Sequence, residues 1–467
     1  MARRVGRVPP SAIASPSIWS RGRDAVDRVA RESPARLTLA VFAGIILLIT
    51  GLLQLPAATV SGQRAPFIDS LFTATSAVCV TGLVTVDTAS FWSPLGKGII
   101  CIAMMGGGLG IMTLASILGM AVSRHIGLTQ RLLAASETKS RLGEVGSLVR
   151  AVVVVAAAAQ AILFLVLIPF FLQRGDALLN ALGHSLFMAA SIFNNAGFVI
   201  MPEGLTPYVG NWALTLPIIL GTFTGAIGFP VILDMWRNRT APHRWNLTTR
   251  ITLVTYFSLF VLGAIALGAC EWSNPQTLGS LSLPDRLNAA LLHSADARSS
   301  GLATLDVGNM TETSWFLIDA LMFVGGGSAS AAGGIKVTTV GVLLLAIIAE
   351  ARGDRDTEAF GKRLPADVLR LGIAVTFVGA LMVLLGTIFL LQVTDLPLSQ
   401  VLFEVISAFA TCGLSTGITP LLPASAKWML VILMYAGRTG TMTLAAALAL
   451  RSRRRLIHLP EERPVIG

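Results

Sequence analysis

A short glycine-containing phrase occurs four times in this chain, and each copy lies between apolar segments. The copies centre on glycines that are 115, 104 and 112 residues apart: Gly82, Gly197, Gly301 and Gly413. A short amphipathic run precedes each glycine, at 67–77, 181–193, 284–295 and 398–409. Self-similarity at a nearly constant spacing indicates one structural unit repeated four times.

The composition indicates a membrane protein. Hydrophobic residues make up 54% of the chain and charged residues only 13%, whereas about a quarter of the residues in a soluble domain are charged. The net charge of +10 would also suit a nucleic-acid partner, but the basic residues lie between the apolar segments. Basic residues in such positions orient helices in a lipid bilayer. We therefore expect the bilayer, and no nucleic acid, as the partner.

Eight apolar segments approach the roughly 20 residues that a helix needs to cross a bilayer. They lie at 37–55, 95–122, 150–172, 213–236, 251–270, 315–348, 369–391 and 428–450. We expect an all-α integral membrane protein in which each unit has two transmembrane helices with a short pore helix between them. Four units would surround a pseudo-fourfold pore. The predicted units lie at 37–122, 123–236, 237–350 and 351–450. An Arg-rich tail at 1–36 precedes them, and a second tail at 451–467 follows them.

The loop charges predict the orientation. The connections between units hold five, four and five Lys or Arg residues, at 123–150, 237–250 and 351–370. The segments that contain the glycine phrases hold one, one, two and one. Because positively charged loops stay inside, we expect both termini in the cytoplasm and all four glycine phrases open to the outside.

The glycine phrases suit the binding of a cation by backbone oxygens. A ring of carbonyl groups can replace the hydration shell of an ion, and glycine allows the close approach and unusual backbone conformations that this needs. The predicted selectivity-filter residues are Val80, Thr81, Gly82, Asn195, Ala196, Gly197, Ser300, Gly301, Thr411, Cys412 and Gly413. Nearby acids such as Asp69, Asp296 and Glu404 would concentrate cations at the mouth, although Asp69 could instead cap its short helix.

A glycine-rich stretch interrupts the sixth apolar segment. Residues 325–334 contain five glycines, so they form a poor helix. Unwound backbone at membrane depth persists only within protein or beside a water-filled cavity. We therefore predict a gate under the filter, composed of Gly325, Gly326, Gly327, Ser328, Ala329, Ser330, Ala331, Ala332, Gly333 and Gly334.

Two cations close to this stretch complete the predicted gate. Lys336 follows the glycines, and Arg438 lies within the last apolar segment. A cation in a membrane span is costly and usually functional. Arg438 would hold the gate closed by donating to its carbonyl groups, because arginine has five donors and stays charged. The alternative is a strut that hydrogen-bonds a neighbouring helix.

These motifs resemble those of the Trk/Ktr/HKT potassium-transporter superfamily over about residues 37–450. The segment 72–83 is similar to the first filter, 333–336 to the end of the intramembrane loop, and 437–440 to the arginine motif of the last helix. With eight predicted spans, the chain is more similar to the ion-conducting subunits of Ktr systems than to Trk subunits. Cys79 and Cys412 stand where Thr or Val is usual.

The resemblance implies potassium uptake across a bacterial plasma membrane. It also implies a homodimer, with one pore in each protomer, on a cytosolic ring of nucleotide-binding RCK subunits of the KtrA type. K⁺ would be the transported ion, with Na⁺ as a second candidate. The sequence has neither a Gly-x-Gly-x-x-Gly after a strand nor a P-loop, so we expect no nucleotide on this chain.

Two other functions are compatible with single features. A Na⁺-permeable uniporter would have the same architecture, but in the family a serine in place of the first filter glycine favours Na⁺, and this chain has Gly82. An intramembrane protease would use Ser328 as a nucleophile and need a base nearby. None of the five histidines lies in a full apolar segment after Ser328. We therefore expect that the chain is not an enzyme.

Overall fold

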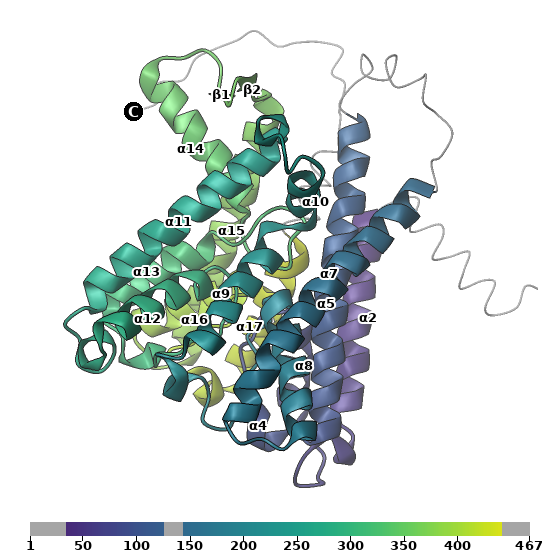
Figure 1. Cartoon of the computed structure of the whole chain (residues 1–467), viewed down its shortest axis with the longest axis vertical. Helices are drawn as coiled ribbons and strands as arrows, with labels where there is room; N and C mark the ends of the chain where they lie inside the picture. Colours follow the sequence, from purple (N-terminus) through teal and green to yellow (C-terminus); the bar gives the residue numbers. More distant parts are fainter. Residues whose placement is uncertain (1–33, 126–142, 441–467) are drawn as a thin grey trace, which may run out of the picture.

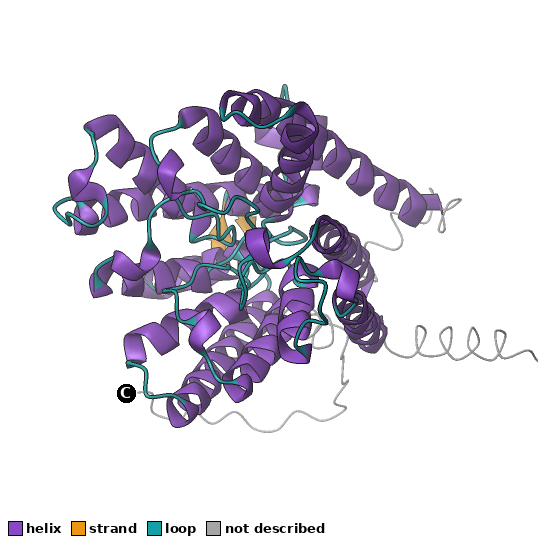
Figure 2. Ribbon diagram, turned by 90° about the horizontal axis from the view of Figure 1, so that it is seen from below, coloured by secondary structure: helices purple, strands orange, loops and turns teal. Residues whose placement is uncertain are grey.

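The computed structural model describes residues 34–125 and 143–440, which are mostly helical. Long helices form the outer part of the molecule, and loops gather at its centre (Figures 1 and 2). On one side α2, α5 and α7 pack together, and on the other α11, α14 and α15 do so. The first group consists of α2 (Pro34–Leu53), α5 (Pro94–His125) and α7 (Gly143–Gln173). The second group consists of α11 (Leu247–Glu271), α14 (Val337–Arg352) and α15 (Ala366–Val393).

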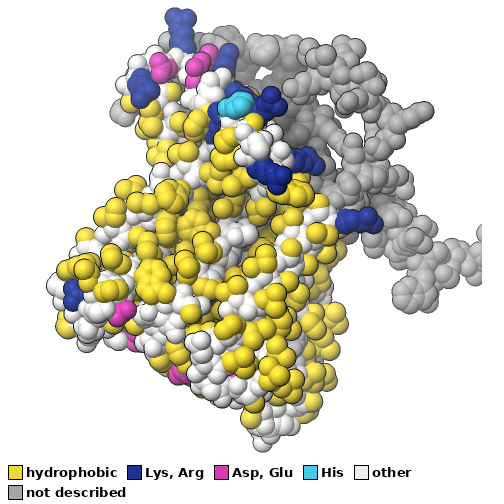
Figure 3. Space-filling view, viewed as in Figure 1, with side chains coloured by type: hydrophobic (Ala, Val, Ile, Leu, Met, Phe, Trp, Pro, Cys, Tyr) yellow, Lys and Arg dark blue, Asp and Glu magenta, His cyan; other side chains and the backbone are white. Residues whose placement is uncertain are grey.

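The outer surface of the long helices is apolar. On α7, for example, Val154, Ile162 and Leu165 are all exposed, and hydrophobic side chains cover the middle of the face seen in Figure 3. Lys and Arg side chains gather at one end, where β1 (Glu358–Ala359) and β2 (Lys362–Arg363) form a small hairpin. A helix that is hydrophobic on all sides is buried either within a protein or in a membrane. The exposed apolar side chains of these helices are therefore suited to contact with lipid.

Four short helices follow the predicted positions closely. Each ends one residue beyond its predicted end, and at least half of the residues in each are buried. Each packs against at least one of the long helices. They are α3 (Phe67–Val78), α8 (Leu178–Asn194), α12 (Leu283–Asp296) and α16 (Leu398–Ala410).

The predicted span at 213–236 is sharply bent in the structure. Helix α9 (Trp212–Ile227) and helix α10 (Phe229–Arg237) meet at an angle of 94°. Gly228 joins them with φ = +99°, a conformation that glycine adopts without steric cost. Pro230 follows in the first turn of α10, where its missing N–H is not needed. The Gly-Phe-Pro sequence was the local signal for this bend.

The predicted interruption of the sixth apolar segment is confirmed. Helix α13 (Glu312–Phe323) ends before the glycines, and α14 begins at Val337. Among the described residues, three helices are long and apolar enough to cross a membrane, or four when α9 and α10 count as one span. The predicted spans at 37–55 and 95–122 correspond to α2 and α5, and the last predicted span is described only as far as Gly440.

The remaining elements are short. Helix α17 (Ala424–Tyr435) leads into one π-helical turn, η7 (Ala436–Gly440), and the predicted continuation to residue 450 lies outside the described residues, as do most of the two predicted tails. Helix α4 (Thr88–Phe91) follows the first phrase. The 3₁₀ turns are η1 (Pro56–Ala58), η2 (Thr206–Tyr208), η3 (Pro242–Arg244), η4 (Leu278–Ser280), η5 (Val307–Asn309) and η6 (Thr419–Leu421).

Candidate functional site

The four glycine phrases share an unusual backbone. In each, the glycine and the residue two positions before it have positive φ angles. The glycine values are +97°, +69°, +68° and +91° for Gly82, Gly197, Gly301 and Gly413. Two positions before each glycine, φ is +56° at Val80, +56° at Asn195, +89° at Ser299 and +48° at Thr411. Positive φ is uncommon for residues other than glycine, so its recurrence at matched positions marks a conformation that the surrounding structure imposes.

The four phrases also meet one another. A Cβ atom on Gly82 would lie 2.7 Å from the Ala196 carbonyl oxygen, and one on Gly197 would lie 3.0 Å from the Ser300 carbonyl oxygen. A Cβ on Gly301 would lie 2.8 Å from the Cys412 carbonyl oxygen.

The fourth glycine closes the ring. A Cβ on Gly413 would overlap the carbonyl oxygen of Thr81 and lie 3.1 Å from the Cα atom of Gly82. Each glycine therefore faces the backbone of another phrase, in the order first, second, third, fourth and first again. A side chain at any of these positions would fill the space between the phrases.

Side chains of the short helices hold these backbones in place. The Gly82 amide donates to Ser76 Oγ at 3.0 Å, and the Gly413 amide donates to Ser407 Oγ at 3.1 Å. In the second phrase, Ser191 Oγ donates to the Phe198 carbonyl at 2.8 Å. These serines all lie six residues before their glycine, where the third phrase has Ala295.

The predicted filter residues are almost all inaccessible from the molecular surface. Val80, Thr81, Asn195, Ala196, Ser300, Thr411 and Cys412 are fully buried. Several amide groups of the phrases bond to the short helices, and one carbonyl oxygen of each phrase lies close to the glycine of another phrase. Such an arrangement can offer a desolvated cation several oxygen ligands without a side-chain charge.

The predicted gate residues form a loop between α13 and α14 that packs at the bend of α9 and α10. The Gly327 amide donates to the Ala226 carbonyl at 2.7 Å, and the Ala331 amide donates to the Gly225 carbonyl at 3.1 Å. The Phe229 amide donates in return to the Ala329 carbonyl at 3.3 Å. The carbonyl groups of Gly225 and Ala226 and the amide group of Phe229, which flank the bend at Gly228, thus form hydrogen bonds with the loop.

The far end of the loop lies against the fourth phrase. A Cβ on Gly333 would overlap Thr411 Oγ1, and one on Gly334 would lie 3.3 Å from the Cα atom of Ala410. The two ends of the loop are joined, because the Gly325 amide donates to the Ile335 carbonyl at 2.9 Å and the Val337 amide to the Gly326 carbonyl at 3.0 Å. Gly326, Ser330 and Ala332 are buried within it.

Both predicted cations bind carbonyl groups of this loop. Arg438 is buried, and its Nη1 donates to the Ala331 carbonyl. Lys336 Nζ donates to the Ala332 carbonyl at 2.5 Å. Arg438 Nε and Nη2 have no hydrogen-bond partner among the described residues. The hydrogen bond of Arg438 thus goes to the loop, at Ala331.

Two of the acids near the phrases, Asp69 and Glu404, make structural contacts. Asp69 does not cap α3, whose N-cap residue is Pro66, and instead pairs with Lys427. Glu404 is fully buried and accepts from Ser415 Oγ, the Thr416 amide and Thr419 Oγ1. It therefore stabilises the segment that follows the fourth phrase. Asp296 is also fully buried, so neither it nor Glu404 lies at an open mouth.

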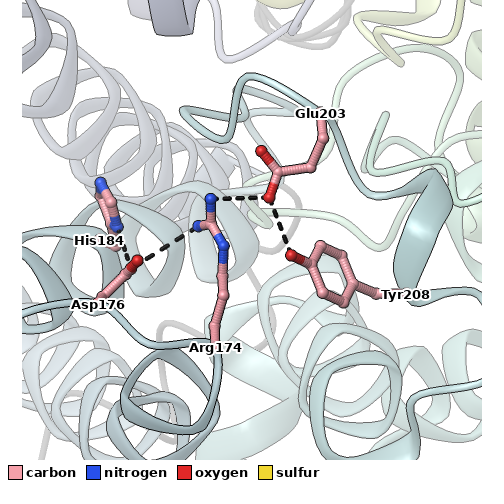
Figure 4. A network of polar contacts seen from close by, with 5 residues as sticks. All are labelled: Arg174, Asp176, His184, Glu203 and Tyr208. Carbon is pink, nitrogen blue, oxygen red and sulfur yellow. Dashed lines mark hydrogen bonds and ion pairs between the residues drawn. The ribbon is translucent and has the colours of Figure 1, made fainter.

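A polar network beside the second phrase was not predicted (Figure 4). Arg174 Nη2 lies 2.7 Å from Glu203 Oε1, which also accepts from the Tyr208 hydroxyl at 2.9 Å. Asp176 lies 2.7 Å from His184 Nδ1 and 3.7 Å from Arg174 Nη1. Burial and the contact with Glu203 raise the pKa of Tyr208 above its usual value. The network joins the end of α7, helix α8 and the loop before α9.

Other kinds of site find little support. Within residues 34–125 and 143–440, there is no group of three or more His, Cys, Asp and Glu residues that could hold a metal ion. The hydroxyl group of Ser328 lies 2.9 Å from Thr338 Oγ1, and a threonine hydroxyl is not a general base. Cys79, Cys101, Cys270 and Cys412 are free thiols.

Comparison with known proteins places the chain in a family. A family model described as "Cation transport protein" (TrkH) matches residues 38–454. The Ktr system potassium uptake proteins D and B of Bacillus subtilis (strain 168) are 35% and 36% identical to this chain. The alignments cover 93% and 91% of this chain, and 97% and 95% of the relatives.

A solved structure has the same fold. The crystal structure of the potassium transporter TrkH from Vibrio parahaemolyticus matches with a TM-score of 0.68 at 17% identity, over 87% of this chain and 84% of that one. At this identity the match concerns the fold alone. The family model and the two Bacillus relatives cover most of the chain, so the chain belongs to the TrkH/Ktr family of membrane cation transport proteins.

Proposed function

We propose that this chain takes up K⁺ across the bacterial plasma membrane through a filter of backbone carbonyl groups. The observation on which this rests is the mutual contact of the four glycine phrases, in which Gly82, Gly197, Gly301 and Gly413 each face the backbone of another phrase. A ring of four backbone segments with oriented carbonyls suits a desolvated monovalent cation. The printed names of the Bacillus relatives support K⁺ as the ion.

The filter would lie in a pore surrounded by four units of two membrane helices and one short helix. The bent pair α9–α10 and the interrupted pair α13–α14 then each count as one of eight spans. Basic side chains gather at the end with the hairpin and α10 (Figure 3), and exposed Arg237, Arg239, Arg352 and Lys362 belong to that end. By the positive-inside rule that end faces the cytoplasm, and both termini lie there.

The loop at 325–334 would be the gate. It lies against the fourth phrase through Gly333 and Gly334 and is clamped by Arg438 at Ala331. Its displacement would have to break the contact with a guanidinium in a site that excludes water, where such charge-assisted hydrogen bonds are strong. A force from the cytoplasmic side, applied to α14 or the hairpin that follows it, would reach the loop through Val337.

The complete transporter would be a homodimer on a cytosolic ring of RCK subunits. The regulatory nucleotide would bind that ring, and Na⁺ would act as a second ion in uptake. The basic connection at 351–370, which includes the hairpin, faces the side where the ring would lie.

Transport by the purified chain tests the proposed function. Rb⁺ uptake is measured in liposomes, and growth on limiting K⁺ is measured in bacteria that lack their own potassium uptake, with and without an RCK partner. We expect Rb⁺ and K⁺ to enter far faster than Na⁺ or Li⁺. Equal uptake of Na⁺ and K⁺ would instead support the Na⁺-permeable uniporter, and absence of growth rescue with the partner present would contradict K⁺ uptake.

A further inference from the structure

The third glycine phrase differs from the other three in its backbone. Its Ser299 has φ = +89°, whereas the matched residues have values of +48° to +56°. In the other phrases the amide before the glycine donates to a serine carbonyl five residues earlier, as Thr81 does to Ser76 at 2.7 Å. The Ser300 amide donates instead to the Asp296 carbonyl, four residues earlier, at 3.0 Å. The third phrase therefore leaves its short helix with a different hydrogen-bond pattern from the other three.

Arg298, directly before this phrase, is fully buried and binds the start of the loop. Its Nη2 donates to the Gly325 carbonyl at 3.1 Å, and its Nη1 donates to the Tyr256 carbonyl of α11 at 2.8 Å. The guanidinium carbon lies 3.8 Å from the centre of the Tyr256 ring. Among the described residues no carboxylate forms an ion pair with Arg298. Carbonyl groups and an aromatic face thus stabilise its charge.

Ser299 binds the other end of the loop. Its hydroxyl group donates to the Thr411 carbonyl of the fourth phrase at 2.9 Å and accepts from the Gly333 amide at 3.3 Å. The two consecutive residues Arg298 and Ser299 therefore hold the loop at Gly325 and at Gly333. Arg438, by contrast, holds the middle of the loop at Ala331.

We infer that Arg298 and Ser299 are positioning residues that couple the loop to the third and fourth filter segments. This inference rests on the proposed filter and gate. An ion in the filter favours one arrangement of the third phrase, and that arrangement favours the loop position that Arg298 and Ser299 bind. Coupling of two sites is reciprocal, so the position of the loop also changes the affinity of the filter for K⁺.

The reactivity of a cysteine in the loop measures this coupling directly. Ser328 is partly exposed, so the S328C variant offers a thiol, and Cys101 and Cys270, the two partly exposed native cysteines, are replaced by alanine. The labelling rate is compared in K⁺ and in choline chloride at equal ionic strength. We expect K⁺ to slow labelling by at least about fivefold, a usual size for coupling between two sites.

Variants then test the link itself. R298K keeps the charge but loses the planar fork that binds two carbonyls at once, and S299A removes the hydroxyl bridge. In S328C/R298K and S328C/S299A the K⁺ effect should fall to less than about twofold. Arg286 is the matched control, because it lies on the same helix α12, donates to the carbonyls of Leu281, Gly279 and Trp272, and stacks on the Trp272 ring, away from the loop. S328C/R286A should keep the full K⁺ effect.

The outcomes separate the inference from the proposed function. The inference is overturned if K⁺ still slows labelling in both S328C/R298K and S328C/S299A. It is also overturned if K⁺ does not slow labelling of S328C although the same protein takes up Rb⁺ into liposomes. Absence of Rb⁺ uptake with and without the partner contradicts the proposed function instead. Because R298K is a change in the core, folding is checked by size-exclusion chromatography, and S299A decides the question if R298K aggregates.

Discussion

The ammonium group of Lys427 lies 3.2 Å from a carboxylate oxygen of Asp69, although 358 positions separate the two residues. Lys427 belongs to the first turn of α17 and Asp69 to the first turn of α3. Along the same pair of units, Tyr435 Oη donates to the Leu39 carbonyl at 2.6 Å. These contacts join helix α17 of the last unit to the first unit. They therefore support the contact between the fourth and first glycine phrases.

Loss of the Lys427–Asp69 pair should destabilise the protein. Both side chains are largely buried, and removal of one leaves the other charge without a partner, which should lower the free energy of unfolding by about 1–3 kcal/mol. The measurement is the melting temperature in detergent of K427A, D69A and the charge-swapped D69K/K427D, which should recover part of the loss. The control is R363A, whose pair with Asp356 is exposed and should contribute little. An unchanged melting temperature in K427A would show that the pair does not hold the ring closed.

A side chain at the first filter glycine should reduce ion selectivity. In G82S the new side chain would crowd the Ala196 carbonyl and the Cα atom of Gly197, and the residue would have to adopt φ near +97°. We expect the ratio of K⁺ to Na⁺ uptake to fall about tenfold, equivalent to about 1.4 kcal/mol of discrimination. The matched control is G183S on α8, because no atom lies within 4 Å of a Cβ there. If serine at Gly82, Gly197, Gly301 and Gly413 leaves the ratio at the wild-type value, these residues do not form the filter.

Release of the middle of the loop should open the pore. R438A removes the donor to the Ala331 carbonyl, and deletion of 328–332 shortens the loop itself. Each should raise Rb⁺ uptake by liposomes with the chain alone by at least about fivefold. The K⁺ to Na⁺ ratio should change little in R438A, because Arg298 and Ser299 still hold Gly325 and Gly333. Flux at or below the wild-type level in well-folded protein of both kinds would mean that the loop is not the barrier.

The predicted orientation can be tested by thiol labelling in whole cells. Cysteines that replace the exposed residues Gln276 and Pro420, on the side of the glycine phrases, should react with an impermeant reagent from outside. Cysteines that replace the exposed Thr240 and Asp354 should react only after permeabilisation. The partly exposed Cys101 and Cys270 are replaced first, whereas Cys79 and Cys412 are buried and can stay. The reverse labelling pattern would place the basic end outside.

Local sequence signals were sufficient for the short helices and for the phrases that follow them. The ends of α3, α8, α12 and α16 fall one residue beyond the predictions, because an amphipathic run that stops at a glycine is a property of neighbouring residues. The interruption before α14 was also predictable, since five glycines in ten residues weaken a helix wherever they occur. The bend at Gly228 had such a signal too, in the glycine and the proline after it, but the apolar run around it hid the break.

Only the tertiary structure decided which groups meet. Arg438 could have bonded a helix or the loop, and it bonds Ala331, 107 residues away. Ser299 and Thr411 are 112 residues apart, and Lys427 and Asp69 are 358 apart. No local pattern specifies such a pair, because the partner of a buried donor is whichever acceptor the packing of distant helices brings within reach, and a buried polar group must find one. The sequence therefore determined where the backbone turns, and packing between the units determined which residues clamp the loop.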